Sequence, residues 1–142
     1  MTTHARKILV LDDDELQLDL VRRYFALSGF DVHASGGRAS LVDELATLQP
    51  GVVLLDVNVP GAGKAALPDL VATVRRTGLD VAVYLFSAED ESTLRRLTAT
   101  CGADGYFAKG TSLESIAAGL EALARKRATT SSARLRAAEE AK

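Results

Sequence analysis

The stretch Ile8-Leu9-Val10-Leu11-Asp12-Asp13-Asp14-Glu15 joins four consecutive apolar residues to a run of acids. A short, uninterrupted apolar run is typical of a strand that is buried on both faces. Val52–Leu55 repeats the arrangement, because this all-aliphatic run stops at Asp56. The two stretches predict neighbouring strands of a parallel sheet, each followed by acidic residues.

Working outward, stretches of helical period separate these runs from other short apolar runs. Further strands are expected at Asp31–Ala34, Val81–Phe86 and Tyr106–Ala108. In the first helical stretch, residues 14–28, the apolar positions recur at helical spacing: Leu16, Leu20, Val21, Tyr24 and Leu27. The later helices are predicted to bury three sets: Leu41, Val42, Leu45 and Leu48; Leu67, Leu70, Val71 and Val74; and Leu94 with Leu97. The segment 111–114, Thr-Ser-Leu-Glu, has capping-box spacing and predicts a last helix with Thr111 as its cap.

Five strands alternating with five helices predict an α/β fold in which helices cover both faces of a parallel sheet. For this length we expect a doubly wound, flavodoxin-like sheet of five strands in the order 2-1-3-4-5. The folded domain is predicted to span residues 5–127. Residues 128–142 form a C-terminal tail, helical or disordered, that is too short for an output domain.

Composition excludes several classes of protein. The chain has 142 residues, of which 47% are hydrophobic and 25% charged, as in an ordinary globular domain. Its formal net charge of −2 gives no sign of a nucleic-acid or membrane partner. Cys101 is the only cysteine, which excludes an internal disulfide, and the N-terminal apolar run is too short for a signal peptide. We therefore expect a cytoplasmic protein.

Chemically active side chains follow several of the predicted strands. Asp12 and Asp13 follow the first strand, Asp56 the third, Ser87 the fourth and Lys109 the fifth. The carboxyl ends of parallel strands meet at one edge of a sheet, so these groups should converge. Two carboxylates about 4 Å apart repel each other by roughly 4 kcal/mol at an effective dielectric constant of about 20. Three carboxylates and one lysine therefore predict a site for a divalent cation with oxygen ligands, Mg²⁺ or Mn²⁺, beside which a carboxylate could attack phosphorus.

Four motifs in order resemble the receiver domains of two-component response regulators. The first is the opening stretch quoted above. The second is Leu54-Leu55-Asp56-Val57-Asn58-Val59-Pro60, which is similar to the phosphoacceptor segment of that family. The third is Phe86-Ser87-Ala88, and the fourth is Gly102-Ala103-Asp104-Gly105-Tyr106-Phe107-Ala108-Lys109. Each motif alone is weak, but the set covers about residues 5–127 at the right spacing.

The resemblance implies a role for each residue of the acidic edge. Asp56 would accept the phosphoryl group, and Lys109 would hold it. Asp13 and Asp56 would bind Mg²⁺ together with the backbone carbonyl of Asn58, while Asp12 would act largely through water.

The resemblance also implies a switch and an output. Ser87 and Tyr106 would move together on phosphorylation and change the face formed by the fourth helix, the fifth strand and the fifth helix. That face would bind a downstream protein or a second copy of the chain. Asn58 and Glu89 resemble the pair that tunes dephosphorylation in chemotaxis regulators, which predicts a short-lived phosphoryl group.

As a whole the chain is expected to act as a stand-alone regulator that is phosphorylated by a histidine kinase or a phosphotransfer protein. It is not expected to turn over an external substrate. One alternative is a phosphatase of the haloacid-dehalogenase type, but such enzymes have an aspartate where this chain has Asn58.

A second alternative is a pseudo-receiver that binds partners without being phosphorylated. Gly110, in the place where receivers usually have proline, is the one feature that favours it. The bond that precedes Gly110 is expected to be trans, because a cis bond to a non-proline residue costs about 2.5–4 kcal/mol. The two histidines, His4 and His33, are isolated in the sequence and suggest no role.

Overall fold

A computed structural model describes the backbone of residues 6–12, 14–57 and 66–140, and the side chains of these residues as far as residue 126. Its strands are β1 (Lys7–Leu11), β2 (Asp31–Ala34), β3 (Val52–Leu55), β4 (Ala82–Ser87) and β5 (Gly105–Ala108). Its helices are α1 (Glu15–Leu27), the short 3-10 helix η2 (Arg38–Ser40), α2 (Leu41–Leu48), α3 (Leu67–Arg76), α4 (Glu91–Cys101) and α5 (Leu113–Glu140).

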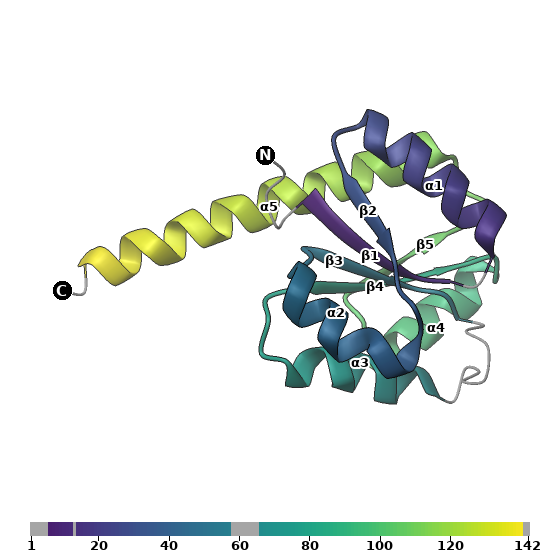
Figure 1. The fold of residues 1–142 in the computed structure, drawn as a ribbon, viewed down its shortest axis with the longest axis horizontal. Coiled ribbons are helices and arrows are strands. Elements are labelled where there is room, and N and C mark those ends of the chain that lie inside the picture. Colours follow the sequence, from purple (N-terminus) through teal and green to yellow (C-terminus); the bar gives the residue numbers. More distant parts are fainter. Residues whose placement is uncertain (1–5, 13, 58–65, 141–142) are drawn as a thin grey trace.

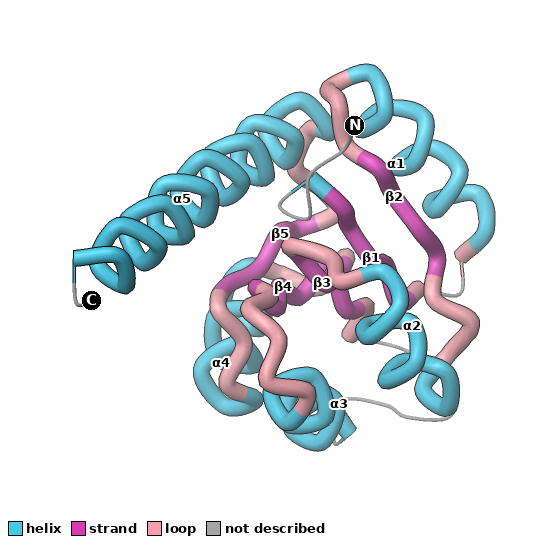
Figure 2. Tube along the Cα trace, turned by 60° about the vertical axis from the view of Figure 1, so that its left-hand side comes forward, coloured by secondary structure: helices cyan, strands magenta, loops and turns pink. Residues whose placement is uncertain are grey.

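The five strands form one parallel sheet in the order β2-β1-β3-β4-β5, which confirms the predicted order. Helices α1 and α5 cover one face of the sheet, and α2, α3 and α4 cover the other (Figures 1 and 2). The sheet is therefore the middle of three layers, with β2 and β5 at its two edges.

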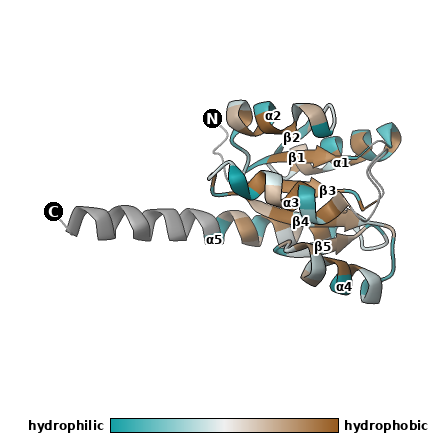
Figure 3. Ribbon diagram, turned by 90° about the horizontal axis from the view of Figure 1, so that it is seen from below, coloured by the Kyte–Doolittle hydropathy of each residue, from teal (hydrophilic) through white to brown (hydrophobic). Residues whose placement is uncertain are grey.

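Each face of the sheet carries its own core. On β1, Ile8 and Val10 point toward α1 and α5, whereas Leu9 and Leu11 point toward α2, α3 and α4. Successive side chains of a strand point to opposite faces, so a continuous apolar run supplies both cores. The apolar colouring of the strands in Figure 3 follows from this arrangement.

The helix predicted over residues 14–28 is present as α1, but only some of its apolar residues face the core. Val21 and Phe25 are completely buried, whereas Leu16, Leu20 and Leu27 are 80%, 56% and 88% exposed. At about 100° per residue, the three exposed leucines lie within about 40° of one another on the helix. The helix thus carries two apolar stripes, and helical spacing alone does not show which of them packs against the sheet.

Two expectations about the later helices need correction. On α2, Val42 is 49% exposed, while Leu41 and Leu45 are buried. The N-terminus of α5 is capped by Ser112, whose Oγ accepts a hydrogen bond from the N–H of Ser115 at 3.1 Å, and not by Thr111. Ser112 is the residue directly before the helix, and its hydroxyl therefore reaches the free N–H groups of the first turn.

Helix α5 is longer than the sheet that it covers. It runs without a break to Glu140, and its second half extends beyond the rest of the domain (Figure 1). Ile116, Ala117, Leu120 and Ala124 are the buried residues of its first half. No helix in the described part of the chain is both long and apolar enough to cross a membrane.

Candidate functional site

The acidic edge of the sheet is built by the ends of four neighbouring elements. Asp12 directly follows β1, Asp56 directly follows β3, Ser87 ends β4 and Lys109 directly follows β5. Backbone hydrogen bonds continue past the strands, from Asp56 N to Leu11 O (2.9 Å) and from Lys109 N to Ser87 O (2.7 Å). The sheet's own hydrogen bonding therefore places these four residues side by side, as the order of the strands predicted.

The Lys109 ammonium lies between the two described carboxylates of this edge. Its Nζ is 2.7 Å from Asp12 Oδ2 and 3.7 Å from Asp56 Oδ2. The side chains of Asp12, Asp56 and Lys109 are only 1%, 9% and 16% exposed. One positive charge thus faces two negative charges in a place that water reaches poorly, so the site keeps a net negative charge.

The pKa of Asp12 reflects a balance between burial and its neighbours. Burial raises this pKa, because it disfavours the charged form. The hydrogen bond from Lys109 lowers it most, followed by the hydrogen bond from the N–H of Asp14, at 3.0 Å, and by the Lys109 charge. The lowering effects are larger in sum, and the pKa of Asp12 lies below its ordinary value.

Ser87 is completely buried at the end of β4. Its Oγ accepts a hydrogen bond from the N–H of Glu89 at 3.3 Å, within the turn that leads to α4. Ser87 is therefore held at the carboxyl end of β4, next to β3, the strand that leads to Asp56.

Tyr106 contacts the start of α4. Its hydroxyl donates a hydrogen bond of 2.9 Å to Glu91 Oε1, in the first turn of α4, while its ring packs against the core on the α3 and α4 side. The same Glu91 oxygen lies 3.6 Å from Arg95. Tyr106 therefore connects the strand beside Lys109 to the start of α4.

The donor set of the edge fits a hard divalent cation. Asp12 and Asp56 offer carboxylate oxygens, which Mg²⁺ prefers, and their excess negative charge would favour its binding. The other two predicted ligands, Asp13 and Asn58, lie outside the described residues. Among the described residues, no cluster of three or more histidine, cysteine or acidic side chains could hold a metal ion. A third protein ligand would therefore have to come from residues outside the described ranges.

Two contacts of the site had no signal in the sequence. The Lys109 ammonium lies 5.3 Å from the centroid of the Phe86 ring, and Tyr106 meets Glu91 across 15 positions of the chain. Both contacts depend on the path of the chain between two elements, and the spacing of residues in the sequence does not show that path. The peptide bond between Lys109 and Gly110 is trans, as predicted.

Comparison with known proteins agrees with this geometry. Residues 8–121 match the response regulator receiver domain family. The chain is 30% identical over 120 residues to the response regulator MprA of Mycobacterium sp. (strain KMS), and 33% identical over 121 residues to MprA of Mycolicibacterium vanbaalenii. Each match covers 84% of this chain and 51% of the relative, so the chain spans about half the length of these curated relatives.

Solved structures show the same fold. The BeF3-activated N-terminal receiver domain of Klebsiella pneumoniae RstA has a TM-score of 0.70 and 26% identity, covering 84% of this chain and 98% of that chain. The signal receiver domain of a putative LuxO repressor protein from Vibrio parahaemolyticus has a TM-score of 0.75 at 13% identity, covering 89% and 95%. Fold, acidic edge and family match agree: the chain belongs to the response regulator receiver domain family.

Proposed function

We propose that this receiver accepts a phosphoryl group on Asp56 in the presence of Mg²⁺. Receiver domains are modules of two-component signalling that work with histidine kinases and downstream effectors, and they are not enzymes that turn over an external substrate. The observation that supports the proposal is the position of Asp56, at the end of a buried strand, 3.7 Å from Lys109 and beside Asp12.

The transfer would use the groups on this edge as follows. An oxygen of the Asp56 carboxylate attacks phosphorus, and the bond between phosphorus and the donor atom breaks with its electron pair left on the donor. Lys109, whose Nζ lies 2.7 Å from Asp12 and 3.7 Å from Asp56, would move from Asp12 toward the phosphoryl oxygens and neutralise part of their charge. Ser87 would then donate its hydroxyl hydrogen to the same group. A bound Mg²⁺ would supply further neutralisation of the phosphoryl oxygens.

Intact mass after incubation with acetyl phosphate and Mg²⁺ tests the proposal. We expect one added phosphoryl group on the wild-type chain and none on Asp56→Asn. Asp19→Asn changes a half-exposed aspartate of α1 that pairs with Arg23; it is the matched control and should be phosphorylated normally. A phosphorylated Asp56→Asn chain would show that another residue is the acceptor, and an unmodified wild-type chain would favour a pseudo-receiver.

The lifetime of the phosphoryl group belongs to the same proposal. Hydrolysis needs a water molecule in line with phosphorus, so the side chains beside the site control its rate. Asn58 and Glu89 are short or polar enough to admit and orient such a water, and we propose a short-lived signal. Decay of the added mass after removal of the donor should be slower in Asn58→Met than in the wild type, and equal rates would refute this role.

The partners are also proposals. We propose a histidine kinase or phosphotransfer protein as the donor, and a protein target or a second copy of the chain that binds the face of α4, β5 and α5. A cytoplasmic location and action without an attached output domain stay predictions, because the chain spans about half the length of its MprA relatives.

A further inference from the structure

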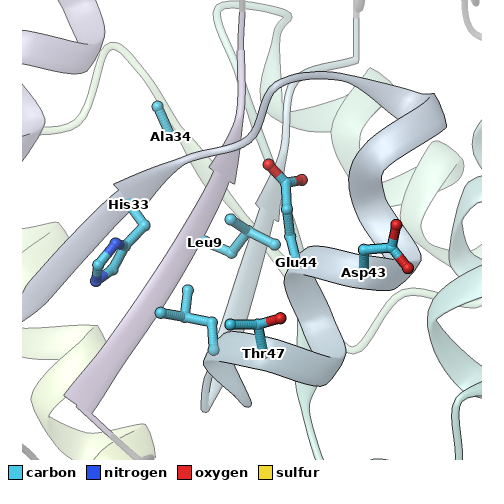
Figure 4. Close-up of a pocket in the computed structure, with 7 residues that line it drawn as sticks. Leu9, His33, Ala34, Asp43, Glu44 and Thr47 are labelled. Carbon is cyan, nitrogen blue, oxygen red and sulfur yellow. The ribbon is translucent and has the colours of Figure 1, made fainter.

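A cavity lies away from the acidic edge, between the edge strand β2 and helix α2 (Figure 4). Its volume is about 310 Å³. Leu9 of β1 and Leu48 of α2 line it with apolar side chains, and Ala34 lines it at the end of β2. These residues form an apolar floor for the cavity at the β2 edge of the sheet.

The cavity exists because both of its walls are incomplete. Helix α2 has eight residues and directs Leu41 and Leu45 into the core, so little of it is left to cover β2. On β2, the residues that face α2 are Asp31 and His33, where a core would need large aliphatic side chains. His33 lies on one wall, and its Nε2 is 2.9 Å from Asp31 Oδ2, without the alignment of a hydrogen bond.

The opposite wall is acidic. Asp43 and Glu44 of α2 line the cavity; in Figure 4 the Glu44 carboxylate points toward the loop after β2, whereas the Asp43 carboxylate points away from Leu9 and His33. Glu44 accepts hydrogen bonds from Ser35 Oγ (2.5 Å) and from the N–H of Gly36 (2.8 Å). Both donors are neutral, so these two bonds orient the carboxylate and leave its negative charge available to a ligand.

We propose that this cavity binds a small organic cation, an ammonium or amidinium group carried on an apolar ring or short chain. The apolar part would lie on Leu9, Leu48 and the His33 ring, and the charged end would face the Glu44 carboxylate. A volume of about 310 Å³ is at the lower end of the range for small-molecule sites, which sets the size of the ligand. This inference does not depend on phosphorylation of Asp56.

Benzamidine and its neutral isostere benzamide test the charge requirement. Amide chemical shifts of the intact, ¹⁵N-labelled chain are followed by NMR during each titration, with both compounds in the same buffer. Mg²⁺ is kept in excess, so that the acidic edge at Asp56 competes less for the amidinium. We expect benzamidine to shift His33, Glu44 and Leu48 with a saturating curve, and benzamide to bind at least several-fold more weakly.

Three variants separate the cavity from other acidic surfaces. Glu44→Gln removes the charge but can keep both turn contacts, because the serine hydroxyl can accept from the new amide; benzamidine binding should weaken about three- to five-fold, the range for one partly exposed charge. Thr47→Phe should fill the cavity and abolish binding. Glu114→Gln, an exposed acid in the first turn of α5, is the control and should bind like the wild type. Equal binding of benzamide, shifts that map to Asp56 instead, or unchanged binding by Glu44→Gln would each overturn the proposal.

Discussion

Arg6 joins three separate parts of the domain. Its Nη2 donates to both carboxylate oxygens of Glu121 on α5, at 2.6 and 2.7 Å, and its Nη1 to the Ser28 carbonyl at 3.4 Å. The guanidinium also lies 4.9 Å from the centroid of the Phe30 ring. A single side chain before β1 thus holds α5 against the turn between α1 and β2.

This contact predicts a pH-dependent contribution to stability. The hydrogen bond from Arg6 lowers the pKa of Glu121 below 4.5, burial opposes the shift, and the charges of Arg6 and Arg125 add to it. A lowered pKa in the folded state stabilises the fold above the unfolded pKa, and the effect is lost as the pH falls through the folded pKa. Glu121→Gln should therefore reduce the free energy of unfolding by about 0.5–1 kcal/mol at neutral pH.

Urea unfolding at neutral pH and in acid provides the measurement. The difference between wild type and Glu121→Gln should shrink as the pH falls below 4.5. Glu114→Gln serves as the control, with no comparable loss at neutral pH. A difference that stays constant over this pH range would mean that the carboxylate charge is not what stabilises the contact.

At the scale of elements, α1 allows a direct test of which apolar stripe holds the fold. Val21 is completely buried, whereas its neighbour Leu20 is 56% exposed. Val21→Ala should destabilise the chain by about 1–3 kcal/mol, because it leaves a cavity against the sheet. Leu20→Ala should cost less than about 0.5 kcal/mol. Urea unfolding of the two variants side by side decides the matter, and a larger loss in Leu20→Ala would reverse the assignment of the stripes.

The link between β5 and α4 gives a prediction about signalling. If Tyr106 turns inward when Asp56 is modified, its hydroxyl must release Glu91, and the first turn of α4 loses a contact. Beryllofluoride, a mimic of the phosphoryl group, should therefore change amide exchange in α4 and β5 of the wild type and leave Asp56→Asn unchanged. Changes confined to residues next to Asp56 would show that the modification does not reach α4.

At the scale of the whole molecule, the acidic edge should make stability depend on divalent cations. The folded state holds Asp12 and Asp56 close together against one lysine, and a bound Mg²⁺ would relieve their repulsion in the folded state only. A cation at about 100 times its Kd would add roughly 2.7 kcal/mol to the free energy of unfolding.

We therefore expect Mg²⁺ or Mn²⁺ to raise the melting temperature by several degrees. Asp56→Asn, and Asp13→Ala by the family resemblance, should remove most of this shift, while Asp19→Asn should keep it. A full shift in both Asp56→Asn and Asp13→Ala would place the cation elsewhere. The melting temperature is measured by thermal unfolding followed by circular dichroism, with and without the cation.

The sequence by itself determined the parallel sheet, the order of its strands and the residues of the acidic edge. These features are local in origin: an apolar run of four residues such as Val52–Leu55 defines a buried strand, and the residue after it, Asp56, must then lie at the sheet's carboxyl edge. Small errors remained at the helix ends, since Thr111 and Ser112 are both good caps and only the backbone path shows which one serves.

Only the tertiary structure decided which groups touch. Lys109 and Asp12 meet across 97 positions of the chain, and Arg6 and Glu121 across 115. Helical spacing placed Leu20 and Val21 in α1 but could not show which of them faces the sheet. Periodicity describes one element at a time, whereas packing depends on the orientation of two or more elements. For the same physical reason the cavity beside β2 became visible only once α2 was found too short to cover it.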